Sequence, residues 1–246
     1  MGTERVGVIG SGVMGSGIAQ VLAIAGHEVR SYDLDASALD RARASVATGR
    51  FGIASAVERG KLTQADADAA LARLTFTTQL DEALDVDVVI EAIPEKLGLK
   101  LEFWSDADRR APERAIFCSN SSGFPIEAMA AVVDRADRMI GWHWASPAPV
   151  MRLAEIVRGP ETSDATVATI VRMAGDAGKN PVVVNDTTRA WGYVANRVYS
   201  AMVREAARVV DEGIASKQDV DQLMVDCFRW PSGPFGMAKG ATSGWK

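Results

Sequence analysis

Only two histidines occur among the 246 residues, so a mechanism that needs an imidazole has two candidates, His27 and His143. Histidine gains and loses a proton near neutral pH, which suits it to proton transfer. His143 lies in a short apolar run, and Glu155 follows twelve residues later in the next run, Leu153 to Val157. If the two runs pair as a hairpin, the carboxylate lies beside the imidazole and fixes its tautomer. The spacing predicts a proton-transfer pair; the alternative is a histidine packed among tryptophans. His27 follows the helix-ending Gly26 and is interpreted as a surface histidine.

A glycine-rich segment near the start has the pattern of a phosphate-binding loop. Gly10, Gly12 and Gly15 match G-x-G-x-x-G, after a β-branched run and before an apolar helical stretch. In such loops the three glycines allow a tight turn, a close approach of pyrophosphate, and packing of helix on strand. Asp33 ends the next predicted strand, where a carboxylate binds a ribose 2′-hydroxyl and repels a 2′-phosphate. The pattern predicts NAD as cofactor, with candidate residues Gly10, Gly12, Val13, Met14, Gly15 and Asp33.

Strand-like and helix-like stretches alternate along most of the chain, which is typical of an α/β domain with a mainly parallel sheet. Residues 36–73 are rich in Ala and Arg and predict two or three helices. Two long helices are expected at the end, from Val194 to Glu212 and from Ser216 to Phe228. We predict a Rossmann-type domain over residues 1–188 and a helical domain over residues 189–246. Strands are expected at residues 6–9, 28–32, 74–78, 86–91, 115–118, 139–142, 153–157 and 181–184.

Composition narrows the function classes. The net charge of −5 and the pI near 5.2 argue against binding to nucleic acid or to an anionic membrane. No apolar run is long enough to span a bilayer, and no signal-peptide pattern precedes Gly10. Two distant cysteines, Cys118 and Cys227, cannot form a disulfide framework or a cysteine-based zinc site. These observations predict a cytoplasmic protein without a metal.

Several motifs occur in the same order as in a known enzyme family and cover nearly the whole chain. They are G-S-G-V-M-G-S-G-I-A from Gly10, V-I-E-A-I-P-E from Val89 with Lys100 after it, S-N-S-S from Ser119, the His143 and Glu155 segments, V-A-N-R from Val194, and G-P-F from Gly233. In these motifs the chain resembles the NAD-dependent 3-hydroxyacyl-CoA dehydrogenase family. The resemblance implies a hydride-transferring oxidoreductase of fatty acid metabolism. A homodimer is expected for a separate reason, because the exposed apolar face of an incomplete helical domain would need to be covered.

The resemblance also implies roles for single residues. His143 would be the general base in oxidation and the general acid in reduction, and Glu155 would orient it. Ser122 would contact the substrate oxygen and the nicotinamide, and Asn196 would hold the substrate carbonyl. Ala92, Glu95, Lys100 and Ser122 would contact the cofactor. The alternatives are that Ser122 caps a helix begun by Pro125, that Asn196 is an exposed helix residue, and that Glu95 and Lys100 form a solvated pair.

The departures from the family bear on the substrate. Ser146 stands where the family has an asparagine near the nicotinamide, so we expect a reshaped substrate wall that includes Ser146. The family's CoA-contacting Ser and Lys fall at Gly49 and Ala56, which leaves Arg50, Arg59 and Lys61 nearby. The chain also ends at Lys246, before a full helical second domain of that family, so the helical domain is expected to be incomplete.

We predict interconversion of a 3-hydroxyacyl-CoA and its 3-oxoacyl-CoA, with a short acyl chain because Trp144 and Trp191 would narrow the pocket. The alternative is the same hydride chemistry on a small non-CoA hydroxy acid or aldehyde.

Overall fold

The structure, a computed structural model, describes the backbone of residues 3–187 and 192–243. The chain divides into two compact units, Met1–Tyr193 and Val194–Lys246. The predicted boundary between residues 188 and 189 lies outside the described residues.

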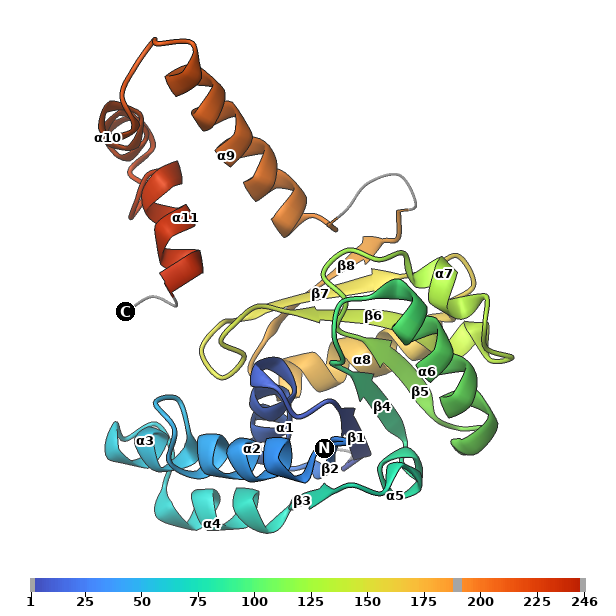
Figure 1. Cartoon of the computed structure of the whole chain (residues 1–246). Helices are drawn as coiled ribbons and strands as arrows, with labels where there is room; N and C mark the ends of the chain where they lie inside the picture. Colours follow the sequence, from blue (N-terminus) through green and yellow to red (C-terminus); the bar gives the residue numbers. More distant parts are fainter. Residues whose placement is uncertain (1–2, 188–191, 244–246) are drawn as a thin grey trace. The chain divides into compact units, whose positions relative to one another are not determined.

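The first unit is built on one eight-stranded sheet of order β3-β2-β1-β4-β5-β6-β7-β8 (Figure 1). Neighbouring strands are parallel except for β6 and β7, which pair antiparallel. This confirms the predicted Rossmann-type, mainly parallel sheet. The strands are β1 (Arg5–Ile9), β2 (Glu28–Tyr32), β3 (Leu74–Thr77), β4 (Val88–Glu91), β5 (Ile116–Ser119), β6 (Met139–Trp144), β7 (Leu153–Arg158) and β8 (Asn180–Asn185).

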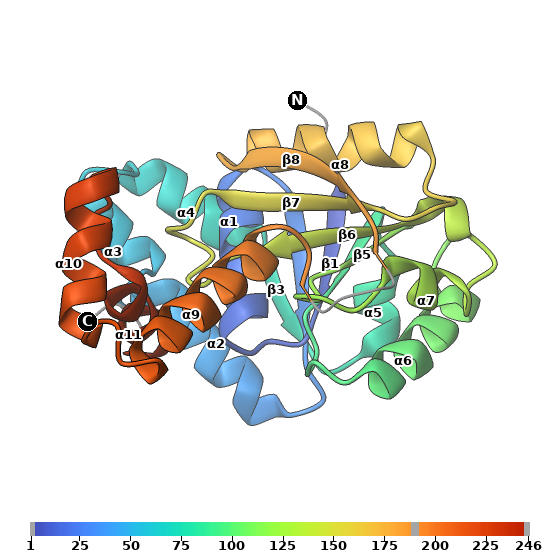
Figure 2. The same ribbon diagram turned by 90° about the horizontal axis from the view of Figure 1, so that it is seen from above.

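Helices cover both faces of this sheet. On one face α1 and α8 share a core with the strands, through Ile18 of α1 and Ile170 of α8. On the other face α5, α6 and α7 form a second core, in which Trp104 of α6 is fully buried. Figure 2 shows α8 lying along β7 and β8. The helices are α1 (Val13–Ile24), α5 (Leu80–Leu84), α6 (Leu97–Arg110), α7 (Ile126–Ala130) and α8 (Asp164–Asp176), with a 3₁₀ turn at Ala136–Arg138.

Residues 36–73 form three helices, as the composition allowed: α2 (Ala36–Thr48), α3 (Ile53–Glu58) and α4 (Gln64–Ala72). They pack on one another in a small core around Val46, Ile53 and Ala70. The Thr63 side chain accepts a hydrogen bond from the backbone of Asp66, which caps the start of α4.

Alternation along β6 and β7 separates a polar face from an apolar one. His143 and Glu155 are directly opposed in the antiparallel register. Trp142 and Trp144 point to the other face, where both are buried in the core shared with α1 and α8. Successive side chains on a strand point to opposite faces, so the imidazole and the indoles cannot share a surface.

The second unit consists of α9 (Ala195–Asp211), α10 (Lys217–Phe228) and α11 (Pro234–Ser243), which confirms a helical domain. Ser216 and Asp219 form a capping box at the start of α10. The Asp221 carboxylate accepts hydrogen bonds from the backbone of Phe235 and Gly236 and so joins α10 to the first turn of α11. In the portion of the chain that the structure describes, no helix is both long and apolar enough to cross a membrane.

Candidate active site

The parallel strands bring the predicted site residues to one edge of the sheet. β1, β2, β4, β5 and β6 all run in the same direction, so their carboxyl ends meet there. Open α/β sheets bind ligands at this edge, next to the point where the strand order reverses. Here that point lies between β1 and β4, because the chain passes from β1 outward to β2 and β3 before it returns to β4.

The glycine loop after β1 has the geometry of a phosphate cradle. Gly10 has a φ of +95°, and a Cβ on it would lie 2.7 Å from the carbonyl oxygen of Ala92. A Cβ on Gly15 would lie 1.7 Å from the carbonyl oxygen of Gly10, so only glycine allows this packing of helix on strand. Gly12 is different, because a Cβ there would meet nothing within 4 Å. The open side of Gly12 is therefore the side from which a ligand can approach.

The start of α1 offers donors to an anion. Gly12 is the N-cap, and no side chain among the described residues caps the helix. The first N–H groups of an α-helix have no partner within the helix and favour a negative charge. Exposed Val13 and half-buried Met14 lie in this turn. The turn therefore fits the pyrophosphate of a dinucleotide.

Asp33 lies beside this turn. Its carboxylate accepts hydrogen bonds from the backbone N–H of Ser11, at 2.8 Å, and of Asp35, at 3.1 Å. A cavity of about 500 Å³ is lined by Gly12, Val13, Asp33, Asp35 and residues of α2. Arg41 also lines the cavity and pairs with Asp35 at 3.6 Å. Asp33, beside the helix start, is placed to accept a hydrogen bond from a ribose hydroxyl. The loop, the open helix start and this cavity together fit NAD.

His143 and Glu155 form a buried pair. The imidazole Nδ1 lies 2.6 Å from the Glu155 carboxylate, and the two residues are 4% and 3% exposed. Glu155 accepts the Nδ1 hydrogen, which leaves Nε2 as the proton-accepting nitrogen of the neutral ring. No described residue forms a hydrogen bond with Nε2. The arrangement can accept a proton at Nε2 and stabilise the resulting imidazolium.

The loop after β5 packs against this pair. The Asn120 side chain accepts a hydrogen bond from the backbone N–H of Trp144, at 3.0 Å, which ties the loop to the strand that carries His143. The Ser122 hydroxyl has no partner among the residues described, so it is available to a ligand. Ser122 does not cap α7: the N-cap position is Pro125, and the first-turn N–H of Glu127 donates to the Asp186 carboxylate at 2.8 Å. The Ser121 hydroxyl instead accepts hydrogen bonds from the backbone of the two residues after Ser122.

Tyr193 is a site residue that sequence reasoning missed. Its ring centroid lies 5.8 Å from that of His143, and its hydroxyl donates to the carbonyl of Phe124 at 2.7 Å. Burial raises the pKa of this phenol, so it stays protonated and donates at physiological pH. Both contacts join Tyr193 to residues at least fifty positions away in the sequence, so no local pattern indicated them.

Glu95 and Lys100 are not a solvated pair. Lys100 is 1% exposed, and its ammonium lies 3.0 Å from Glu95 and 2.5 Å from Glu91, which is fully buried. Glu95 in turn accepts hydrogen bonds from the Ser121 hydroxyl and from the backbone N–H of Ser122. Ala92 is half-buried and backs onto Gly10. The structure thus joins three of the predicted cofactor residues, Glu95, Lys100 and Ser122, and adds Glu91, to which the sequence analysis gave no role.

Other predictions fall elsewhere. Ser146 is exposed in the loop between β6 and β7, two residues after the end of the strand bearing His143. Asn196 is a half-buried residue of the second unit, in the first turn of α9. Trp191 lies outside the described residues. Trp144 is 2% exposed within the core, so the expectation that it narrows an acyl pocket is wrong.

His27 corrects a further expectation, because it is 2% exposed rather than on the surface. Its Nδ1 lies 3.2 Å from Glu4, which also pairs with Arg172 of α8. Burial lowers the pKa of His27, with Glu4 opposing the effect. This cluster lies at the start of β1, at the sheet edge opposite to the glycine loop, and is structural.

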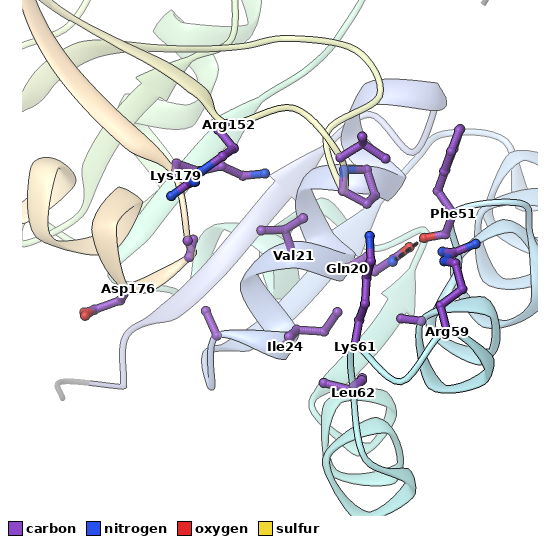
Figure 3. Close-up of a pocket in the computed structure, with 16 residues that line it drawn as sticks. Gln20, Val21, Ile24, Phe51, Arg59, Lys61, Leu62, Arg152, Asp176 and Lys179 are labelled. Atoms are coloured by element: carbon purple, nitrogen blue, oxygen red, sulfur yellow. Dashed lines mark hydrogen bonds between the residues drawn. The ribbon is translucent and has the colours of Figure 1, made fainter. Parts of the chain in front are cut away.

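A second cavity, of about 450 Å³, lies between α1, the α2–α3 turn and the loop before β7. Figure 3 shows Arg152 and Lys179 on one side of it and Arg59 and Lys61 on the other. Asp176 is the one acidic residue among those lining it. Arg59 and Lys61 were named from the sequence, whereas Arg152 and Lys179 come from distant segments and were not. The cavity is suited to an anion.

The described residues contain no cluster of His, Cys, Asp and Glu side chains that could hold a metal ion.

Comparison with known proteins places this geometry in a family. Residues 5–187 match the model of the 3-hydroxyacyl-CoA dehydrogenase NAD binding domain, and residues 192–245 match that of the C-terminal domain. The chain is 39% identical to a probable 3-hydroxybutyryl-CoA dehydrogenase of Bacillus subtilis over 238 residues, which is 97% of this chain and 81% of the relative.

Solved structures support the same family assignment. An (S)-3-hydroxybutyryl-CoA dehydrogenase from Ralstonia eutropha superposes with a TM-score of 0.89 at 38% identity, covering 95% of this chain and 80% of that one. A 5-formyl-3-hydroxy-2-methylpyridine 4-carboxylic acid 5-dehydrogenase, described as an NAD+-dependent dismutase, gives 0.78 at 31% identity, covering 91% and 70%. With a dinucleotide cradle and both family domains present, the chain belongs to the 3-hydroxyacyl-CoA dehydrogenase family and is an NAD-dependent oxidoreductase of that type.

Proposed function

We propose that the protein interconverts a short-chain 3-hydroxyacyl-CoA and its 3-oxoacyl-CoA, with His143 as the acid/base residue and Glu155 as its orienting partner. The observation that carries the proposal is the buried 2.6 Å contact between His143 Nδ1 and Glu155, at the edge of the sheet that also holds the glycine loop. The preference for a short chain is supported by relatives named 3-hydroxybutyryl-CoA dehydrogenases.

We propose a part for each side chain in this reaction. In oxidation the Nε2 atom of His143 accepts the hydroxyl proton of the substrate, and in reduction it returns that proton to the carbonyl oxygen. Glu155 stabilises the imidazolium through the Nδ1 hydrogen. The Ser122 hydroxyl donates a hydrogen bond to the substrate oxygen. NAD supplies the hydride chemistry when it is bound. That Asn196 contacts the substrate carbonyl stays a prediction.

The CoA carrier is supported by the second cavity. Arg59, Lys61, Arg152 and Lys179 line it with one acid, so it offers an excess of positive charge to the phosphates of a carrier nucleotide. The loop that follows His143 also provides Pro149 and Arg152 to the cavity wall, which connects the two sites along one segment.

Formation of NADH, with NAD+ and either 3-hydroxybutyryl-CoA or free 3-hydroxybutyrate, tests the proposal. We expect kcat/KM to be at least about a hundredfold higher for the thioester. Lys61→Ala should raise KM for the thioester several-fold and leave KM for the free acid unchanged. A preference for the free acid would reject CoA as the carrier.

The second candidate is hydride transfer on a small non-CoA hydroxy acid or aldehyde. Two observations favour it: the glycine and alanine at positions 49 and 56, and the similarity to the pyridine carboxylate dehydrogenase described above. The same experiment distinguishes the two, because equal rates with the free acid and the thioester would support this candidate.

We further propose a cytoplasmic homodimer. Large apolar side chains are exposed on the second unit, including Val198, Leu223 and Phe228, and such surfaces are commonly covered by a second copy. Both cysteines are free, with Cys227 exposed, which suits a reducing compartment. A monomer in sedimentation at micromolar concentration would contradict the dimer.

A further inference from the structure

A buried lysine lies at the centre of the loops that follow β4 and β5. Lys100 is in the second turn of α6, and its ammonium contacts Glu91 at 2.5 Å, Glu95 at 3.0 Å and the carbonyl of Ile93 at 3.5 Å. An ammonium has three hydrogens and no acceptor, and the two glutamates take two of these hydrogens, whereas the contact with the Ile93 carbonyl is long for a hydrogen bond. Lys100 is therefore held mainly by the two carboxylates, in a position that is 1% exposed.

The two glutamates carry the contacts onward. The second oxygen of Glu91 accepts the Ser119 hydroxyl at 2.8 Å. The second oxygen of Glu95 accepts the Ser121 hydroxyl at 2.6 Å and the backbone N–H of Ser122 at 2.9 Å. Each glutamate thus contacts Lys100 with one oxygen. With its other oxygen, Glu91 bonds the last residue of β5, and Glu95 bonds the loop that follows β5.

Stability alone does not account for this cluster. A buried ion pair is often no more stable than well-packed apolar residues of the same volume, whereas the loss of one partner is costly. Burial raises the pKa of Glu91, and the Lys100 ammonium opposes this rise, so the charge of Glu91 depends on Lys100. Lys100 fixes the direction of the Glu95 carboxylate and, through it, the backbone of Ser122, which apolar residues in its place could not do.

We propose that Glu91 and Lys100 are positioning residues for the cofactor site, which act by holding Glu95 and the Ser122 backbone in place. Only Glu95 in this cluster is partly exposed, so it is the member that can reach a ligand. The inference rests on the proposed function in one respect, namely that Ser122 and Glu95 face the bound dinucleotide. It assigns Lys100 an indirect role where the family resemblance implied a contact.

The test is Glu91→Gln, which keeps the shape of the side chain and removes its charge. NADH binding is measured by fluorescence titration, and the melting temperature without cofactor is measured in parallel. We expect Kd for NADH and KM for NAD+ to rise about tenfold, which corresponds to about 1.4 kcal/mol, the loss of one charge-assisted hydrogen bond.

The matched control is Asp108→Asn. Asp108 forms a partly buried ion pair with Arg135 in the same unit, at 2.6 Å, and has no contact with the loops of the cofactor site. This variant should lower the melting temperature and leave Kd for NADH unchanged. If Glu91→Gln behaves like the control, with Kd within twofold of the original value, the cluster is merely structural and the proposal fails.

Ser119→Ala gives a milder test if Glu91→Gln does not fold. It removes one hydrogen bond from Glu91 and retains both ion pairs, so Kd for NADH should rise about threefold with little change in melting temperature. An unchanged Kd in this variant would also overturn the proposal. Because NADH binding needs no substrate, a failure of the proposed thioester reaction would leave these results interpretable.

Discussion

Replacing Glu155 by glutamine isolates the contribution of one carboxylate to catalysis. The change keeps the size of a side chain that is 3% exposed, and an amide oxygen can still accept the Nδ1 hydrogen of His143. The hydrogen bond to Nδ1 is therefore retained, and the fold should lose little. The imidazolium that forms during turnover, however, loses its negative partner at 2.6 Å.

The magnitude follows from that contact. A hydrogen bond between charged groups contributes about 1.5–3 kcal/mol, and each 1.4 kcal/mol corresponds to a tenfold change in rate. We expect kcat of Glu155→Gln to fall roughly 10- to 100-fold, with Kd for NADH unchanged. His143→Gln should cost about 10²–10⁴-fold, because it removes the proton acceptor itself.

The double variant gives the sharper result. Since Glu155 acts on the reaction only through His143, His143→Gln with Glu155→Gln should be no slower than His143→Gln alone. The assay is NADH formation with the thioester under saturating NAD+, with melting temperatures as the control for folding. The reasoning is refuted if Glu155→Gln keeps its rate within threefold, or if the two losses multiply in the double variant.

Three further results are expected. Gly15→Ala should destabilise the fold by several kcal/mol and abolish NADH binding, because the added Cβ has no room beside Gly10. Gly12→Ala should fold normally and weaken only NADH binding, so equal melting temperatures for the two variants would contradict this reasoning. Asp33→Ala should raise KM for NAD+ about tenfold and lower the preference for NAD+ over NADP+, as measured by kcat/KM for both. Burial lowers the pKa of Lys179 to about 8, from 10.5 in the unfolded chain. Between these two pH values the unfolded chain binds a proton that the folded chain has released, so the free energy of unfolding of the original protein, relative to that of Lys179→Met, should rise with pH across this window. A difference in unfolding free energy that stays flat with pH would count against this.

Much of the fold could be predicted because its signals are local. The strands at the centre of the sheet are short apolar runs, and the glycine pattern marks the turn into α1. The His143 and Glu155 register could also be anticipated, since a twelve-residue spacing across a hairpin loop brings the two residues opposite each other. Helix α8 was overlooked, although Ser163 caps it and Ile170 lies on its buried face. A helix there was required by topology, because β7 and β8 are parallel and need a crossover connection.

The contacts that the sequence analysis missed share a different cause. Glu91 and Lys100 are residue types that are almost never fully buried unless paired, and the pairing is visible only once β4 and α6 are in place. Tyr193 reaches His143 from fifty residues further along the chain. His27 is buried because α8 brings Arg172 to Glu4 beside it. In each case the decisive neighbour is distant in sequence, so no local pattern carried the information.

The reversal of chain direction between β6 and β7 separates a strand register that must be kept from a loop whose sequence can vary. The pair of His143 and Glu155 depends on strand register alone, and a shift of one residue would turn the carboxylate toward Trp142 and Trp144 on the opposite face. Residues 145–152, which join the two strands, carry Ser146 at one end and part of the cationic cavity at the other. Insertions or exchanges in this loop can therefore change the lining of the cationic cavity while the pairing of His143 with Glu155 stays as it is.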